Sequence, residues 1–302
     1  MCIQLFENSI TGVIRVSGED SLDYLQSQLT IDLTKLSINQ TRPALRLSLK
    51  GRVLFGTQVI RSAEEEFLLF CQNTPANEVI SLLEENMVAD EVEFCEIPEN
   101  WQTSTLYHAS SLNDALAILG INQLKPREAV PLNGGWAYRN VSMPGESISL
   151  IHKNGHLREL AEKISAGNPI EWEILRLQHG FFYPGMEIGS EEFPQEGGLE
   201  RDCVDFDKGC YLGQEVMARI HAMGKVRKQA LAVEGGRSGN ITLPSSLLAE
   251  NKKVGTLKSL FTIPDSNRFV GAAIVHENAV ALLKAKGLQI EGTPQQVHIF
   301  QG

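Results

Sequence analysis

The stretch KGCYLGQE, at residues 208–215, is the most informative part of this chain of 302 residues. Two glycines, Gly209 and Gly213, flank a cysteine and an aromatic side chain, so the backbone can bend sharply here and approach a ligand closely. The stretch therefore predicts a tight turn that presents Cys210 at a binding site.

A helix is predicted to begin directly after this turn. Residues from Gln214 onward favour a helix, and Glu215 and Arg219 have the i,i+4 spacing of a stabilising ion pair. Cys210 would then lie just before the helix N-terminus, where the helix dipole and Lys208 both favour its thiolate. This makes Cys210 a candidate nucleophile or transient metal ligand, whereas a lone cysteine is otherwise a small buried apolar side chain.

Charge changes sign around this stretch. Residues 191–207 hold seven acidic side chains against one basic one, and residues 208–229 hold five basic side chains against one acidic one. A solvated loop followed by a solvated helix would also give this pattern. Combined with the turn, the pattern offers both carboxylates and cations to a ligand.

Composition limits the classes of protein to consider. At about 150 residues per domain, 302 residues suggest two domains. The formal net charge of −10 argues against general binding to DNA, tRNA or an anionic membrane, because each needs a cationic face. The first residues lack the features of a signal or transit peptide. Five scattered cysteines argue against a disulfide framework or a self-contained metal site, so we expect a reducing, cytoplasmic compartment.

Residues 1–223 read as an antiparallel α+β domain, because strand and helix patterns alternate without a βαβ rhythm. The capping-box-like sequence SGED at residues 17–20 predicts the start of a helix. Lys50-Gly51 predicts the turn of a hairpin between the strands at 45–49 and 53–60. Strands are predicted at 10–16, 45–49, 53–60, 67–71, 92–97, 103–108, 136–139 and 147–151, and further helices at 75–86, 113–119, 157–166 and 170–179.

Helix signals fade after residue 223, and residues 224–302 read as a separate β domain. Short strand candidates separated by turns suit a small barrel or sandwich. They lie at 226–233, 241–243, 254–261, 269–275 and 297–300. The motifs of P-loop NTPases, dinucleotide enzymes, zincins and α/β-hydrolases are absent from the whole sequence.

KGCYLGQE followed by Ala218-Arg219 resembles the signature of the YgfZ-type folate-binding proteins. These are relatives of the T-protein, the aminomethyltransferase of the glycine cleavage system. The octapeptide is the specific match, and weaker matches in the same order extend over nearly the whole chain. They are VSGEDSLDYLQSQLTID at 16–32, KGR at 50–52, LRLQHG at 175–180, PQEGGL at 194–199 and VGTLKS at 254–259.

The resemblance implies a ring of antiparallel α+β subdomains around a central channel, with a small C-terminal β barrel. It also implies tetrahydrofolate in that channel and no permanently bound metal. A carboxylate suits the donor edge of a reduced pterin, and Arg or Lys suits the glutamate tail. By motif position we expect folate contacts from Lys208, Tyr211, Gln214 and Arg219, then from Arg176, Arg139, Glu196 and Glu146, with Gly209, Gly213 and Glu215 completing the motif.

The resemblance favours an accessory factor in the assembly or repair of iron–sulfur clusters over a classical enzyme. Such a factor indirectly supports tRNA modification by cluster enzymes, and its partners are cluster-assembly proteins or client enzymes. A cluster generally takes about four ligands, so Cys210 would act only transiently, at the mouth of the channel.

The alternative is a folate-dependent aminomethyl or methyl transferase of the T-protein type. That chemistry needs an acid beside the folate, an Asp shortly after a strand in the T-protein. The corresponding residues 70–79 hold Glu78 as their single acid, which also suits the first turn of a helix. The T-protein family also lacks the cysteine of the KGCY motif, so we expect this activity less.

Overall fold

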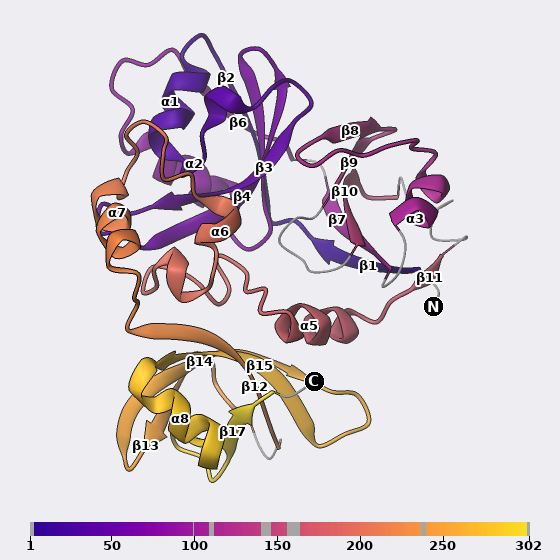
Figure 1. The fold of residues 1–302 in the computed structure, drawn as a ribbon. Helices are drawn as coiled ribbons and strands as arrows, with labels where there is room; N and C mark the ends of the chain where they lie inside the picture. Colours follow the sequence, from indigo (N-terminus) through magenta and orange to yellow (C-terminus); the bar gives the residue numbers. More distant parts are fainter. Residues whose placement is uncertain are drawn as a thin grey trace.

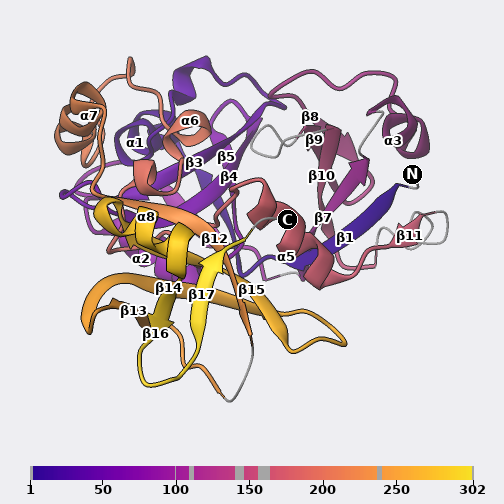
Figure 2. The same cartoon turned by 60° about the horizontal axis from the view of Figure 1, so that its bottom comes forward.

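The computed structural model describes residues 3–98, 100–108, 112–139, 146–155, 164–236 and 240–300. Two sheet units and a closed barrel are arranged around a common centre (Figure 1). Turning the molecule brings the barrel forward and shows α5 between the barrel and β1 of the second unit (Figure 2). The predicted α+β class with a C-terminal barrel is confirmed.

The first unit is a five-stranded antiparallel sheet in the order β3-β4-β5-β2-β6. Alternating apolar residues place Phe55, Val59 and Leu69 in its core, where they meet Leu25 and Leu29 from the first helix. Its elements are β2 (Gly12–Ser17), α1 (Ser21–Gln28), η1 (Leu33–Lys35), β3 (Thr41–Leu47), β4 (Val53–Ala63), β5 (Glu66–Cys71), α2 (Ala76–Glu84) and β6 (Glu93–Glu96).

The second unit is a six-stranded sheet in the order β11-β1-β7-β10-β9-β8, antiparallel except for the β1–β11 pair. Leu106, Ile148 and Leu150 pack against Leu116 of α3. Its elements are β1 (Gln4–Ser9), β7 (Trp101–His108), α3 (Leu112–Leu119), β8 (Ala129–Leu132), β9 (Gly135–Arg139), β10 (Glu146–Lys153) and β11 (Ser165–Ala166).

A long connection joins the second unit to the barrel. Asn168 and Glu171 form a capping box at the start of its first helix, and Trp172 of that helix lies on Phe6 of β1, with ring centroids 5.5 Å apart. The connection contains α5 (Pro169–Gln178), η2 (Pro194–Glu196), α6 (Glu200–Cys203) and α7 (Gln214–Met223).

The barrel closes in the order β12-β15-β14-β13-β16-β17 around Val233, Leu257, Phe269 and Val275. The predicted domain boundary at 223/224 falls between the end of α7 and the first barrel strand. The barrel elements are β12 (Lys228–Gly236), β13 (Ser245–Ala249), β14 (Lys252–Thr262), β15 (Arg268–His276), α8 (Glu277–Lys286), β16 (Leu288–Ile290) and β17 (Gln296–Ile299).

Several local predictions differ from the structure. Asp20 is the N-cap of α1 without a side-chain cap, because its carboxylate accepts a hydrogen bond from the Glu91 N–H at 2.8 Å. The predicted helix at 157–166 ends in a strand, β11, and its residues 157–163 lie outside the described residues. The barrel strand predicted at 241–243 lies at β13 instead, and helix α8 was not predicted.

Candidate functional site

A cavity of about 600 Å³ lies where the two sheet units, the α5–α6 connection and the barrel meet. Thr57 and Phe70 of the first sheet, Tyr138 of the second sheet and Gln229 of β12 all line it. Its volume lies within the range of small-molecule binding sites. The cavity occupies the position of the predicted central channel.

Glu196 places a buried carboxylate in the cavity wall, with 5% of its surface exposed. Its Oε2 atom accepts a hydrogen bond from the Phe193 N–H at 3.0 Å and lies 3.6 Å from Nη1 of Arg52. Burial raises the pKa of Glu196, against the opposing effects of these two donors. Neighbouring Gln195 also lines the cavity, and its Oε1 atom is buried with no hydrogen-bond partner among the described residues. The wall therefore offers two adjacent acceptors to a ligand.

Arg176, predicted to contact folate, lies behind the cavity wall and is fully buried. Its guanidinium donates to both carboxylate oxygens of Glu187, at 2.7 and 3.3 Å, and pairs with Glu173 as well. It also donates to the Phe181 carbonyl at 3.0 Å and lies 4.4 Å from the ring centre of Tyr183. Since Phe181 and Tyr183 line the cavity, Arg176 holds the wall in place.

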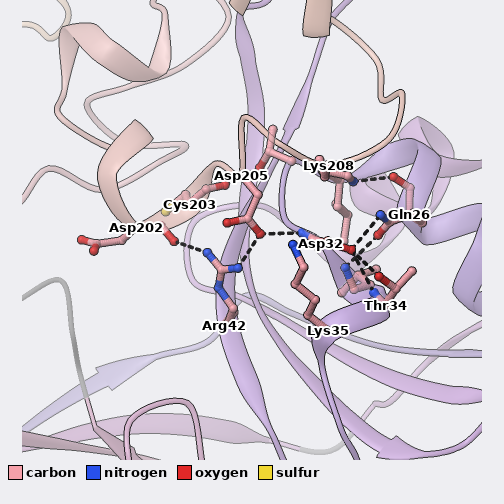
Figure 3. A network of polar contacts seen from close by, with 12 residues as sticks. Gln26, Asp32, Thr34, Lys35, Arg42, Asp202, Cys203, Asp205 and Lys208 are labelled. Atoms are coloured by element: carbon pink, nitrogen blue, oxygen red, sulfur yellow. Dashed lines mark hydrogen bonds and ion pairs between the residues drawn. The ribbon is translucent and has the colours of Figure 1, made fainter. Parts of the chain in front are cut away.

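The KGCYLGQE stretch lies against helix α1 and outside the cavity lining (Figure 3). The Lys208 ammonium donates to the carbonyl oxygens of Gln26 and Leu29, at 2.6 and 2.7 Å. Burial lowers the pKa of Lys208 to about 8. The ammonium is therefore bound to α1, and the predicted pairing of Lys208 with the Cys210 thiolate is not formed.

The remaining residues of the stretch have distinct positions. Cys210 is exposed, as a reactive thiol requires, four residues before α7 begins at Gln214. Tyr211 is buried in the apolar cluster beneath α7, and burial raises its pKa to about 12. Gln214 Nε2 donates to the Lys208 carbonyl at 3.4 Å. None of these side chains lines the cavity.

The two glycines of the stretch differ in their surroundings. Gly213 has a φ of +82°, and a Cβ there would lie 2.6 Å from the Ser48 carbonyl oxygen. The close approach predicted for this glycine is therefore made to the β3–β4 turn. At Gly209 a Cβ would meet nothing within 4 Å.

The other predicted residues are dispersed. Glu215 and Arg219 are exposed on α7 and form no ion pair with each other. Arg139 lines a smaller pocket of about 190 Å³ beside the cavity. Glu146 begins β10, and its side chain is outside the described part of the structure.

A polar network that no sequence pattern predicted attaches the segment after α6 to the loop after α1. The Asp32 N–H donates to Asp205 at 2.7 Å, and Arg42 pairs with the same carboxylate (Figure 3). A hydrogen bond from Lys35, 2.8 Å away, lowers the pKa of Asp32, and Thr34 adds to this effect. These bonds place Cys203 and Asp202 in the cavity wall.

Within the described ranges, no group of three or more His, Cys, Asp or Glu side chains is arranged to hold a metal ion. The same ranges contain no helix that combines the length and the apolar character needed to cross a membrane.

Comparison with known proteins gives relatives over most of the chain. The tRNA-modifying protein YgfZ of Hamiltonella defensa is 25% identical over 291 residues, which cover 91% of this chain and 84% of that protein. Its counterpart from Yersinia pseudotuberculosis is 23% identical, with 88% and 83% covered. An aminomethyltransferase of Thermoanaerobacter pseudethanolicus is 25% identical, with 95% and 81% covered. No family model matches the chain.

The fold has a counterpart among solved structures. The glycine cleavage system aminomethyltransferase T from Bartonella henselae superposes with a TM-score of 0.73 at 18% identity, covering 98% of this chain and 84% of that one. This similarity confirms the expected fold. The chain is thus a homologue of the proteins named tRNA-modifying protein YgfZ and of aminomethyltransferases, and it has the fold of the glycine cleavage T-protein.

Proposed function

We propose that this chain binds tetrahydrofolate in the central cavity and acts as an accessory factor in the assembly or repair of iron–sulfur clusters. Through cluster enzymes it supports tRNA modification, and the name of the YgfZ relatives favours this part of the proposal. The proposal places the protein in a reducing, cytoplasmic compartment and includes no direct contact with DNA, tRNA or a membrane.

The position of Glu196 in the cavity wall carries the folate part of the proposal. A reduced pterin presents a ring N–H and a 2-amino group side by side, and one carboxylate accepts both bonds. The Oε1 atom of Glu196 has no hydrogen-bond partner among the described residues, and the Oε1 atom of Gln195 has none either. Binding would supply donors to both acceptors, of which Gln195 Oε1 is buried away from solvent.

The cavity walls also suit the flat, partly apolar body of a folate. Phe70, Trp172, Phe182 and Tyr183 contribute aromatic surface, and Tyr138 adds a half-buried ring. Desolvation of the Tyr138 hydroxyl raises its pKa to about 12. Bound tetrahydrofolate would serve here as a structural or redox-protective ligand. The residues of this chain bind it, orient it and exclude water from it.

Thermal unfolding with and without tetrahydrofolate tests this binding. At a ligand concentration about 100 times Kd, the free energy of unfolding is expected to rise by about 2.7 kcal/mol. Glu196→Gln should lose most of the rise, because one of the two accepting oxygens becomes an NH₂ group. That group is a donor and cannot accept the second pterin hydrogen bond. Glu191→Gln, an exposed change in the same loop, is the control and should keep the rise. No shift for the parent protein at saturating concentrations would reject folate binding.

Cys210 supplies the cluster-related part of the proposal. Its thiol is exposed, so a partner's cysteine or cluster can reach it. One thiolate cannot hold a cluster alone, so it would share a cluster with a partner protein or exchange with a partner's cysteine.

Complementation in a strain with a cluster-enzyme defect tests this role. Cys210→Ser is expected to abolish rescue while unfolding and tetrahydrofolate binding stay at parental values. Cys95→Ser, a change at a partly exposed cysteine on β6, should keep full rescue. Full rescue by Cys210→Ser would rule out the thiol mechanism.

A T-protein-type transferase remains the alternative, supported by the shared fold. The site argues against it, because Gln72 and Asn73 line the cavity whereas Glu78 is exposed on the first turn of α2. Turnover of an aminomethyl donor by the purified protein would reverse this ranking.

A further inference from the structure

The basic side chains of residues 208–229 lie outside the lining of the central cavity. Lys208 is bound to α1, and Lys228 is partly buried at the start of β12. The other three cations lie on α7 or directly after it, and all are exposed. They are Arg219, Lys225 and Arg227. Their side chains form no ion pair or hydrogen bond with any residue in the described part of the chain, so they are available to a partner.

The turn between β3 and β4 packs against the first half of α7 and continues its exposed surface. A Cβ at Gly51 would lie 3.1 Å from the Val216 side chain, and the Gly51 N–H donates to the Ser48 carbonyl at 2.8 Å. Leu49 and Lys50 form the exposed tip of the turn. Lys50 therefore adds a fourth cation beside α7.

Two large apolar side chains lie among these cations. Leu49, at the tip of the turn, is 76% exposed, and Met223, at the end of α7, is 63% exposed. Met and Arg are enriched at protein–protein interfaces, whose apolar centre has a polar rim. We call this surface the α7 face, and it consists of Leu49, Lys50, Arg219, Met223, Lys225 and Arg227.

Cys210 is held close to the α7 face. Gly213, which contacts the β3–β4 turn, follows it by three residues, and three residues span at most about 11 Å. On the other side of Cys210, the ring of Phe206 stacks on the ring of His221 in the last turn of α7, with centroids 3.9 Å apart. Helix α7 lies at the periphery, away from the second sheet unit (Figure 1 and Figure 2). A protein that covers the α7 face therefore comes within reach of the Cys210 thiol.

The chemistry of the α7 face favours an acidic protein over a nucleic acid as its occupant. Its four cations outnumber the exposed carboxylates beside it, Glu215 on α7 and Asp207 before Cys210. At physiological salt the Debye length is about 8 Å, so these local charges decide the contact although the whole chain carries −10. A nucleic acid would pair with the cations but leave Leu49 and Met223 without an apolar contact, and neither is a ring on which a base stacks.

We propose that the α7 face docks a partner protein whose contact surface combines carboxylates with apolar side chains. This inference rests on the proposed function, in which a partner's cysteine or cluster meets Cys210. The carboxylates would pair with the cations of the face, and the apolar side chains would pack on Leu49 and Met223. Docking would thereby bring the partner's reactive group to the Cys210 thiol, because the face and the thiol belong to one surface.

Thiol–disulfide exchange with two synthetic peptides tests the docking. The acidic probe combines Glu and Leu side chains with one cysteine, which is activated as a mixed disulfide with pyridine-2-thiol. The basic probe has Lys in place of every Glu. The Cys210 thiolate attacks the sulfur of the peptide cysteine, the disulfide of the probe breaks, and pyridine-2-thiolate leaves and takes a proton from solvent. The part of the rate that Cys210→Ser loses is the Cys210 rate.

The two probes should react with Cys210 at different rates. We expect the acidic probe to react about tenfold faster than the basic probe at low salt, because the face attracts its carboxylates. The two rates should converge near 1 M salt, where the Debye length is about 3 Å.

Two triple variants locate this preference on the α7 face. The charge variant is R219Q/K225Q/R227Q, and its control, at exposed barrel positions, is K252Q/K253Q/K284Q. The charge variant should reduce the ratio of the two rates to about twofold, and the control should keep the parental ratio. In the complementation assay the charge variant should lower rescue, although its tetrahydrofolate-induced rise in Tm stays parental.

A single variant tests the apolar part of the face. Leu49→Ser should slow the acidic probe about threefold, because the apolar contact is lost. Val88→Ser, at another exposed apolar position, should leave the rate unchanged. Iodoacetamide is uncharged and should react with Cys210 at the same rate in every variant, and thermal unfolding checks that each variant is folded.

The outcomes separate this inference from the proposed function. Equal rates of the two probes, or a parental ratio or full rescue in the charge variant, would overturn the docking proposal and leave folate binding and the role of Cys210 standing. Displacement of the acidic probe by tRNA at or below the probe concentration would assign the face to a nucleic acid. A dimer in sedimentation that Leu49→Ser dissociates would assign it to a second copy of this chain, and both results would overturn the proposal. Full rescue by Cys210→Ser would instead overturn the thiol mechanism, while the ratio of the probe rates would stand.

Discussion

The Lys208 ammonium lies 2.7 Å from the carbonyl oxygen of Leu29, the C-cap residue of helix α1. It also binds the Gln26 carbonyl, and the Leu212 N–H donates to the Ser27 carbonyl at 3.2 Å. The last carbonyls of a helix have no partners within it and carry the negative end of its dipole. The KGCYLGQE stretch therefore caps α1 from 179 residues away and fixes the loop that carries Cys210.

Replacing Lys208 should destabilise the protein. Lys208→Met leaves the carbonyls of Gln26 and Leu29 without their donor, and unpaired buried acceptors cost about 1–3 kcal/mol each. We expect the free energy of unfolding in urea to fall by about 2–4 kcal/mol. Lys225→Met, at an exposed position after α7, should change it by less than about 0.5 kcal/mol. Equal stability of the two variants would contradict the capping role.

The pH dependence of stability gives a second test of Lys208. Its pKa is about 8 in the folded protein and 10.5 in the unfolded chain. Between these values the unfolded chain binds more protons, so the Lys208 contribution to stability rises with pH from about 8 to 10.5. A neutral amine keeps two N–H donors for the two carbonyls. Urea midpoints at about pH 7 and pH 10 should therefore show a rise in the parent protein that is smaller in Lys208→Met.

Gly213 and Gly209 form a matched pair for testing the turn. Ala at Gly213 must adopt a φ of +82° and brings its Cβ within 2.6 Å of the Ser48 carbonyl oxygen. We expect Gly213→Ala to lower the free energy of unfolding by about 2 kcal/mol or more. Gly209→Ala meets no atom within 4 Å and should be nearly neutral. The pair can be compared by thermal unfolding, and equal effects would be evidence against this account of the turn.

The buried ion pair of Arg176 should matter far more than an exposed one. Arg176→Met leaves Glu187 as an uncompensated buried charge, which costs about 3–5 kcal/mol. Arg268→Met breaks an exposed pair with Glu234 and should cost less than about 1 kcal/mol. Thermal unfolding measures both variants. A small effect of Arg176→Met would mean that the 181–187 loop is held by other contacts.

The local parts of the site could be predicted from sequence. The helix expected to start near Gly213 begins at Gln214, because the turn and helix propensities are encoded within a few residues. Helix α8 also had local signals, with Lys284 and Lys286 in its last turn and Gly287 after it, but the surrounding strand patterns concealed them.

The long-range parts could not be predicted. Nothing near Lys208 in the sequence indicates that its ammonium binds carbonyls of α1. The smaller pocket beside the cavity is lined by arginines from four separate segments, and no local pattern unites them. They are Arg42, Arg127, Arg139 and Arg201. Arg176 was predicted at the site from its position in a motif, but its buried partner Glu187 lies 11 residues further on, after a turn.

The pH dependence of tetrahydrofolate binding should identify Glu196 as the pterin acceptor. Burial raises the pKa of Glu196 above its ordinary value of 4.5. Without ligand, the folded protein therefore holds the Glu196 carboxyl proton more tightly than the unfolded chain does. The contribution of Glu196 to stability consequently falls as pH rises from 4.5 through the raised pKa. When tetrahydrofolate is bound, the pH dependence of the Glu196 contribution reverses, because only the carboxylate form accepts both pterin bonds. The ligand-induced rise in Tm should therefore grow over the same pH range. Glu196→Gln should show neither trend, and Glu191→Gln should show both. A ligand-induced rise that has the same pH profile in Glu196→Gln as in the parent would mean that another group receives the pterin.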